Sequence, residues 1–236
     1  MTTTDAFDVA TALTEAARVM NRRQSMEETL DQIVRLAVET LPEFDHVGVS
    51  VAGRRGRIET LAGTDRLVWE LDDMQYALDE GPCVDAIRRD RIVLVEHAPG
   101  DQRWPRYMAQ AAQRGLRAQL GLRLATDERT LGGLNLYSTR ADEVDPESVR
   151  LAELFATHAS IALWRVNLEE QLNRAVATRK VVGQAMGIVG ERYRLTSDRA
   201  FQFLVRESQQ SNVKLRDVAQ AVVDLADERY GVGAAS

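Results

Sequence analysis

The segment "RKVVGQAMGIVGERYRLTSDRAFQFLVRESQQSNVKLRDVA", from Arg179 to Ala219, determines how the C-terminal tail of the chain folds. Its apolar residues recur at helical spacing almost throughout, and it contains no proline. It is also basic: Gln171 to Arg216 holds nine basic and three acidic residues, although the chain has a formal net charge of −6. The sequence therefore predicts a helical, locally positive tail attached to an acidic body.

Capping residues divide this tail into helices. Asn212 is suited to cap a last helix that Gly231 ends, and an earlier helix covers Val181–Val189, so we expect a three-helix unit. Gly187 lies inside a helix, where glycine costs about 1 kcal/mol relative to alanine. We therefore expect another helix or a ligand backbone to approach it closely. The residues expected to be buried in the last two helices are Ala200, Phe201, Leu204, Leu215, Val218, Ala219 and Val222.

A heptad-like stripe precedes the three-helix unit. From Leu151 to Val182, residues of the stripe alternate in steps of three and four, and His158, Arg165 and Arg179 interrupt its apolar character. Two interpretations are open: one long amphipathic helix packed on its own sheet, or a parallel coiled coil. A helix of about 40 residues is about 60 Å long, more than a domain of this size covers. We therefore favour a homodimeric coiled coil.

The chain before Pro146 alternates short helices and strands. Helical periodicity predicts helices at Asp5–Met20 and Ser25–Leu41, and Ser25 with Glu28 fits a capping box. The predicted strands are His46–Ala52, Arg57–Gly63, Arg91–His97, Leu116–Ala125 and Leu131–Thr139, and the predicted shorter helices are Pro82–Asp90 and Arg103–Gly115. Five or six strands with interspersed helices predict an antiparallel α+β fold.

Composition narrows the possible functions. No apolar run reaches the roughly 18 residues of a membrane span, and the N-terminus does not resemble a secretory signal, so we expect a cytoplasmic protein. The single cysteine, Cys83, excludes an internal disulfide. The three histidines have no metal-site spacing, and no catalytic triad or carboxylate pair is apparent. We therefore expect no metal, no cofactor and no enzymatic activity.

The tail carries four motifs whose order and spacing resemble those of the ANTAR domain, the RNA-binding antiterminator module of bacterial regulators. They are Arg179 followed by Val181 and Val182, "QAMGIV" (Gln184–Val189), "AFQFLVRESQQSN" (Ala200–Asn212) and "KLRDVA" (Lys214–Ala219). Met186 stands where the family usually has lysine. One phosphate contact of the family is therefore missing, or a neighbour such as Lys180 or Arg192 replaces it.

Three motifs earlier in the chain are "DEGPCVDAIR" (Asp79–Arg88), "DQRWP" (Asp101–Pro105) and "LGGLNLYS" (Leu131–Ser138). They resemble a GAF sensor domain of the kind fused to ANTAR in actinobacteria. The resemblance implies a pocket that holds a small organic ligand or none. The expected lining residues are Cys83, Val93, Trp104, Leu134 and Leu136. Cys83 itself is an oxidant sensor or, as is more usual for a free cysteine, a small buried hydrophobic residue.

Together the resemblances imply an α+β GAF domain at residues 5–165 and an all-α ANTAR domain at 166–230, with the helix from about residue 146 as a coiled-coil neck. They imply a signal-responsive, homodimeric antiterminator that binds paired hairpin loops in leader RNA. One alternative is a DNA-binding regulator, disfavoured because "QQSNVK" lacks a turn glycine; another is a GAF receptor whose tail only dimerises. The residues expected to bind RNA are Arg179, Lys180, Gln184, Gly187, Arg206, Ser208, Gln209, Lys214 and Arg216.

Overall fold

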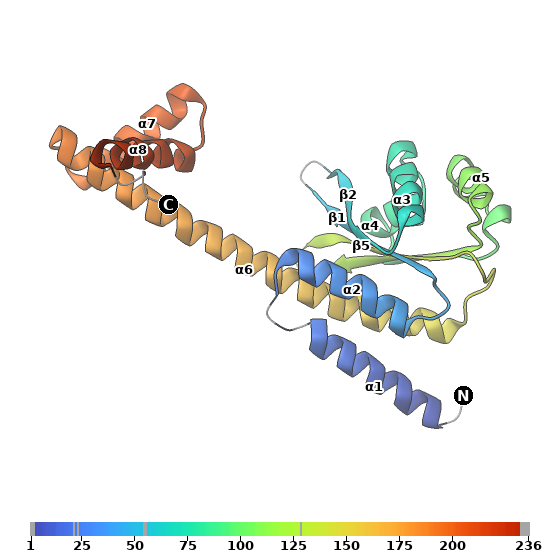
Figure 1. Ribbon diagram of the computed structural model, residues 1–236. Helices are drawn as coiled ribbons and strands as arrows, with labels where there is room; N and C mark the ends of the chain where they lie inside the picture. Colours follow the sequence, from blue (N-terminus) through green and yellow to red (C-terminus); the bar gives the residue numbers. More distant parts are fainter. Residues whose placement is uncertain (1–2, 21, 23, 54–55, 128, 232–236) are drawn as a thin grey trace. The chain divides into compact units, whose positions relative to one another are not determined.

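The structure is a computed structural model that describes residues 3–20, 22, 24–53, 56–127 and 129–231. The chain forms two compact units, a first unit up to Asn167 and a second unit from Leu168. The first unit contains a five-stranded sheet with helices on both faces (Figure 1), and the second unit is helical. The predicted α+β fold followed by a helical tail is therefore confirmed.

The sheet is antiparallel throughout and has the strand order β2-β1-β5-β4-β3. Its strands are β1 (His46–Ala52), β2 (Ile58–Gly63), β3 (Ile92–Val95), β4 (Ala118–Ala125) and β5 (Thr130–Ser138). The strands β1 and β2 pair as an antiparallel hairpin, and residues 54–55 between them lie outside the described residues. The central strand β5 is buried on both faces, because helices cover both sides of the sheet.

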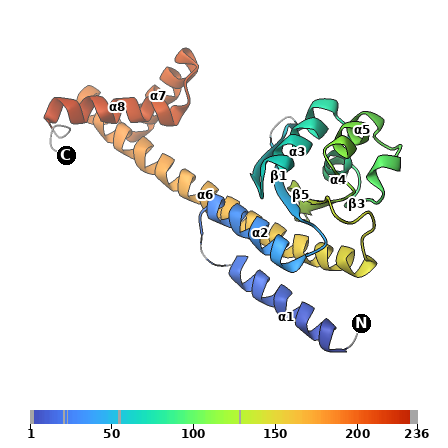
Figure 2. The same cartoon turned by 45° about the vertical axis from the view of Figure 1, so that its right-hand side comes forward.

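One face of the sheet is covered by α2 (Met26–Thr40) and by the first part of α6 (Pro146–Tyr193), while α1 (Thr3–Met20) packs against α2 (Figure 2). The capping box that starts α2 is confirmed. The Ser25 hydroxyl accepts a hydrogen bond from the Glu28 amide, and the Glu28 carboxylate accepts one from the Ser25 amide. Both bonds satisfy amides that the helix itself leaves unpaired.

The opposite face is covered by α3 (Arg66–Leu78), α4 (Pro82–Arg88) and α5 (Pro105–Gln113), with a short 3₁₀ helix at Ala98–Gly100. The first turn of α4 lies directly on β4. A side chain at Gly121 would place its Cβ 2.8 Å from the carbonyl oxygen of Pro82, so glycine is required there for this close approach. The motif around Cys83 is held against the sheet in this way.

The helix α6 is 48 residues long and begins at Pro146, as the sequence predicts. In the first unit it buries Ala152, Phe155, Ala159 and Leu163. The heptad-like stripe lies on a different side of the helix. Its members Leu154, Ile161, Leu168 and Leu172 are between 40 and 58% exposed. The stripe member Leu151 does pack against the core of the first unit, whereas the four exposed members do not.

The second unit consists of the end of α6, α7 (Ser197–Ser211) and α8 (Leu215–Tyr230). The buried residues of its core are Val182, Ala185, Val189, Ala200, Leu204 and Ala219. Phe201, which the sequence analysis expects in this core, is 42% exposed, and Phe203 packs against the core instead. The spacing of Ala200 and Leu204 fixes the buried side of α7, and position 201 falls outside it.

Asn212 ends α7 rather than starting α8. It is the C-cap of α7 with a left-handed backbone (φ 54°), and Lys214 is the N-cap of α8. Asparagine adopts this conformation more readily than most residues, so it replaces the glycine that commonly ends a helix. The lack of a turn glycine therefore gives no reason to reject a helix-turn-helix.

Candidate functional site

The basic residues expected to bind RNA form no ion pair among the described residues, whereas Arg174 of the same unit pairs with Glu170 at 2.9 Å. Five residues of the expected set are basic and exposed: Arg179, Lys180, Arg206, Lys214 and Arg216. Within the described part of the chain, none of the five lies within salt-bridge distance of a carboxylate. Arg206 in particular is not a structural partner of Glu207 or Asp217. The charge of these residues therefore faces solvent without internal neutralisation.

The predicted contacts form one row on each helix. Lys180, Gln184 and Gly187 lie on one side of α6, because they are four and three residues apart. Arg206 and Gln209 are three residues apart on α7, and Lys214 and Arg216 lie at the start of α8. All seven residues are exposed. Arg179, by contrast, lies seven residues after Leu172, so it continues the heptad-like stripe.

Ser208 has a structural role that the sequence analysis did not foresee. Its hydroxyl donates a hydrogen bond to the carbonyl oxygen of Val213, at an Oγ–O distance of 2.6 Å. The bond spans the connection between α7 and α8 and holds its geometry. The hydroxyl proton of Ser208 is therefore used inside the chain, but its oxygen can still accept a hydrogen bond, so a contact of Ser208 with RNA stays a prediction.

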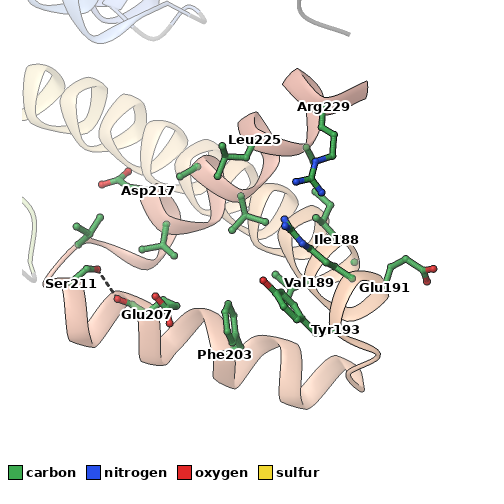
Figure 3. Close-up of a pocket in the computed structure, with 17 residues that line it drawn as sticks. Ile188, Val189, Glu191, Tyr193, Phe203, Glu207, Ser211, Asp217, Leu225 and Arg229 are labelled. Atoms are coloured by element: carbon green, nitrogen blue, oxygen red, sulfur yellow. Dashed lines mark hydrogen bonds between the residues drawn. The ribbon is translucent and has the colours of Figure 1, made fainter. Parts of the chain in front are cut away.

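An apolar groove of about 880 Å³ opens between the three helices of the second unit (Figure 3). Its walls include Tyr193 from α6, Phe203 from α7 and Leu225 from α8. The rings of Tyr193 and Phe203 lie with their centroids 5.7 Å apart and their planes tilted by 31°. Gly187 is the one member of the predicted RNA-binding set that lines this groove. Helical spacing marks Tyr193 and Leu225 as apolar residues off the core, but it does not reveal that they face each other.

The five residues expected to line a pocket in the first unit do not surround one space. Val93 and Trp104 pack between the sheet and α3–α5, and Cys83 lies in a small cluster under α4. Leu134 and Leu136 face the other side of the sheet, where they pack in the core with α2 and α6. The prediction of one shared pocket is therefore wrong, because residues 134 and 136 alternate with 135 and 137 along β5.

A hydrogen-bonded polar cluster occupies the space between the sheet and α3. The carboxylate of Asp72 accepts hydrogen bonds from the Thr60 hydroxyl (2.6 Å), the Asn135 amide (2.9 Å) and the Tyr137 hydroxyl. All four residues are buried. No basic side chain of the described residues pairs with Asp72. Burial in the absence of a cation raises the pKa of Asp72 to about 6, and the donated hydrogen bonds oppose this shift.

Cys83 is buried beside this cluster. Its Sγ lies 3.8 Å from the Ser50 hydroxyl, and its backbone amide donates to the Gln75 side chain at 2.8 Å. Burial raises the pKa of the Cys83 thiol to about 12, so the reactive thiolate is disfavoured at neutral pH. Of the two interpretations of Cys83, the geometry favours the buried hydrophobic residue over the oxidant sensor.

The raised pKa of Asp72 predicts a pH dependence of stability. Between about pH 4 and pH 6, the folded chain holds a proton that the unfolded chain has released, so the contribution of Asp72 to stability falls as pH rises through this window and levels off above about pH 7. Asp72→Asn removes this titration. The stability of the variant relative to the wild type should therefore increase by on the order of 2 kcal/mol from pH 4 to pH 6.

Urea unfolding followed by tryptophan fluorescence measures this difference, because Trp69, Trp104 and Trp164 all lie in the first unit. Asp73→Asn is the matched control, since Asp73 is the exposed neighbour of Asp72. If the unfolding free energy of Asp72→Asn follows that of the wild type at every pH, the pKa of Asp72 is not raised in the folded protein.

No three histidine, cysteine, aspartate or glutamate side chains of the described part of the chain are placed to hold a metal ion. None of its helices combines the length and the apolar character that crossing a membrane requires.

Comparison with known families matches both units. Residues 23–163 match the sequence profile described as the GAF domain, and residues 170–223 match the one described as the ANTAR domain. No curated protein matches the chain closely enough to count as a relative. The two family matches cover the same parts of the chain as the motifs found in the sequence.

Solved structures show the fold of the first unit independently. The GAF domain of a phosphoenolpyruvate-protein phosphotransferase from Acinetobacter is similar at 15% identity, with a TM-score of 0.55 over 71% of this chain and 97% of that one. The corresponding domain from Coxiella burnetii is similar at 16% identity, with a TM-score of 0.56 over 70% of this chain and 98% of that one. A domain of a putative two-component sensor histidine kinase from Sinorhizobium meliloti 1021 is similar at 14% identity, with a TM-score of 0.53 over 64% of this chain and 99% of that one. At these identities the likeness shows the fold alone.

Proposed function

Because the chain belongs to the GAF domain family and continues into an ANTAR domain, we propose that it is a signal-responsive transcription antiterminator. In this proposal the second unit binds hairpin loops in nascent leader RNA, and the first unit controls that binding. The observation that carries the proposal is the set of exposed, unpaired basic residues in the unit that matches ANTAR. GAF and ANTAR domains are regulatory rather than catalytic, so we propose a regulator and not an enzyme, acting in the cytoplasm where transcripts are made.

The chemistry of the basic rows suits RNA. Arginine offers a planar fork of donors to phosphate and a flat face to unpaired bases, while lysine binds phosphate as a point charge. Proteins read RNA sequence mainly in single-stranded loops, where bases are unstacked and accessible. Arg206 and Lys214 are therefore proposed as phosphate contacts, and Gln184 and Gln209 as hydrogen-bonding partners of bases or sugars.

The exposed stripe on α6 supports a homodimer. Leu168, Leu172 and Val176 are 40%, 58% and 67% exposed, and they follow one another at four-residue spacing. Such a row of apolar residues on one helix is typical of a surface that another helix covers. We propose that two copies pair along α6 and so present two RNA-binding units to a pair of hairpins.

Affinity measurements at two salt concentrations test the RNA contacts. Arg206→Ala and Lys214→Ala should each weaken binding to every RNA sequence and lower the salt slope by roughly 0.7 to 0.9, because each removes one phosphate contact. Gln209→Ala should instead narrow the difference between a cognate and a scrambled loop. Fluorescence anisotropy with a labelled two-hairpin RNA measures both effects.

Arg150→Ala is the control, since Arg150 is an exposed arginine of the first unit. Circular dichroism checks that each variant is folded. If the three folded variants bind like the wild type, the RNA-binding surface is wrongly placed. Tighter binding to duplex DNA than to the hairpins would establish the DNA-binding alternative. Unchanged terminator readthrough in a variant that carries all three substitutions would establish a second unit that only dimerises.

A further inference from the structure

The apolar groove of the second unit lies next to the proposed RNA contacts on α6. Lys180 and Gln184 precede Gly187 by seven and three residues, so the three residues follow one side of the helix. Gly187 lines the groove, and no atom lies within 4 Å of the position that its Cβ would occupy. An RNA strand bound along Lys180 and Gln184 would therefore meet the open groove at Gly187.

Arginine side chains border the groove on α7 as well. Phe203 forms one wall, and Arg199 and Arg206 lie four residues before it and three residues after it. Residues at these spacings are neighbours on a helix surface. Both arginines are exposed, and neither has an ion-pair partner among the described residues. Two positive charges therefore flank Phe203, one on each side of it along α7.

The interior of the groove suits a base better than a phosphate. Tyr193 is 53% exposed, so much of its surface is open to a ligand, and the Arg192 guanidinium carbon lies 5.7 Å from its centroid. Glu191, Glu207 and Asp217 also line the groove with Arg192 and Arg229, so the lining carries one more negative than positive charge and disfavours a phosphate. The same carboxylates can accept hydrogen bonds from the amino and imino groups of a base. Aromatic faces stack on bases of any sequence.

The groove is not part of the surface proposed for dimerisation. Gln184 lies 12 residues after Leu172, which is about 120° around an α-helix. The row that leads to the groove and the apolar stripe are therefore on different sides of α6. A second copy bound along the stripe would leave the groove accessible.

We propose that this groove binds one unpaired base of the RNA loop, stacked against Tyr193, with its flanking phosphates against the basic residues at the margin. The inference rests on the proposed function and adds to it the site that takes a base. An amphipathic helix of a partner protein is the competing occupant of such a groove. The basic residues on both bordering helices favour RNA, and the experiment tests whether the groove takes a base.

The test combines protein variants with RNAs in which one loop base at a time is replaced by an abasic site. Tyr193→Ala should weaken binding of the intact two-hairpin RNA by about 5- to 150-fold, the range for loss of one base–aromatic stack. Tyr193→Phe should bind nearly like the wild type, because the ring remains. For one abasic RNA, Tyr193→Ala should cause no further loss. Leu225→Ala, in the opposite wall, should weaken binding in the same base-dependent way.

Phe201→Ala is the matched control: Phe201 is an exposed aromatic residue of α7, two positions from Phe203 and therefore on another side of the helix. The variant Phe201→Ala should bind the two-hairpin RNA like the wild type. If Tyr193→Ala and Leu225→Ala bind every RNA like the wild type while Arg206→Ala and Lys214→Ala bind more weakly, the groove takes no base but the proposed function stands. If the wild type binds no hairpin RNA, the proposed function fails and this inference fails with it.

Discussion

Leu168→Asp combined with Leu172→Asp is expected to convert the proposed dimer into a monomer. The two leucines are 40% and 58% exposed on one side of α6, and the proposed partner helix covers them. Placing two carboxylates in an apolar interface costs several kcal/mol for each desolvated charge. Light scattering should therefore report a molar mass near 26.4 kDa instead of twice that value.

The matched control is Asn173→Asp combined with Ala177→Asp. It places the same two charges four residues apart, but five positions further along, about 140° around the helix. This variant should remain a dimer. A variant Leu168→Asp/Leu172→Asp that keeps the dimeric mass would rule out pairing along this stripe. Equal dissociation of both variants would show that added charge, rather than position, disrupts the assembly.

Gly132→Ala is expected to destabilise the first unit strongly. A Cβ at Gly132 would lie 1.8 Å from the carbonyl oxygen of Ser50 and 2.9 Å from the Cα of Val51, so it would collide with the backbone of the neighbouring strand. The pairing of β1 with β5 would have to separate, because no side-chain rotation relieves this clash. We expect a loss of about 4 kcal/mol or more, at the upper end of the range for single substitutions.

Gly133→Ala provides the control in the same strand. Its Cβ would lie 3.2 Å from two side-chain atoms of Ile87, which can shift, so we expect a loss of about 1 kcal/mol. Urea unfolding monitored by tryptophan fluorescence compares the two variants. Equal stability of Gly132→Ala and the wild type would show that β1 and β5 pair differently from the register described above.

Periodicity in the sequence identified most elements of the fold, because most buried faces in this chain are made of apolar residues. Periodicity did not identify the helix α3, because part of its buried face is polar. Asp72 and Gln75 are buried on the inner side of α3, where a pattern search expects apolar residues. Asn135 and Tyr137 similarly alternate with Leu134 and Leu136 on β5, and both faces are buried. A strand buried on both sides gives no sign in its sequence of which side holds a polar cluster.

The candidate RNA-binding residues were identified from motifs and charge, and their partners were not. The approach of α7 to α8 decides that the Ser208 hydroxyl bonds to the Val213 carbonyl. It also decides that no carboxylate lies within ion-pair distance of Arg206. The groove depends on the same packing, since Tyr193, Phe203 and Leu225 come from three helices. Helix periods locate the side on which each residue lies, but not which helices leave a space between them.

The small core of the second unit has a consequence for its melting. Three of its six buried residues are alanines, so it removes little apolar surface from water. Calorimetry of the whole chain should accordingly resolve two transitions, with the second unit melting first. If a second copy and an RNA loop bind only the folded form, mass action raises this lower melting temperature with protein concentration and with added RNA. The ANTAR domain would then reach its full thermal stability only in the assembled complex, whereas the GAF domain holds its own fold in the free protein.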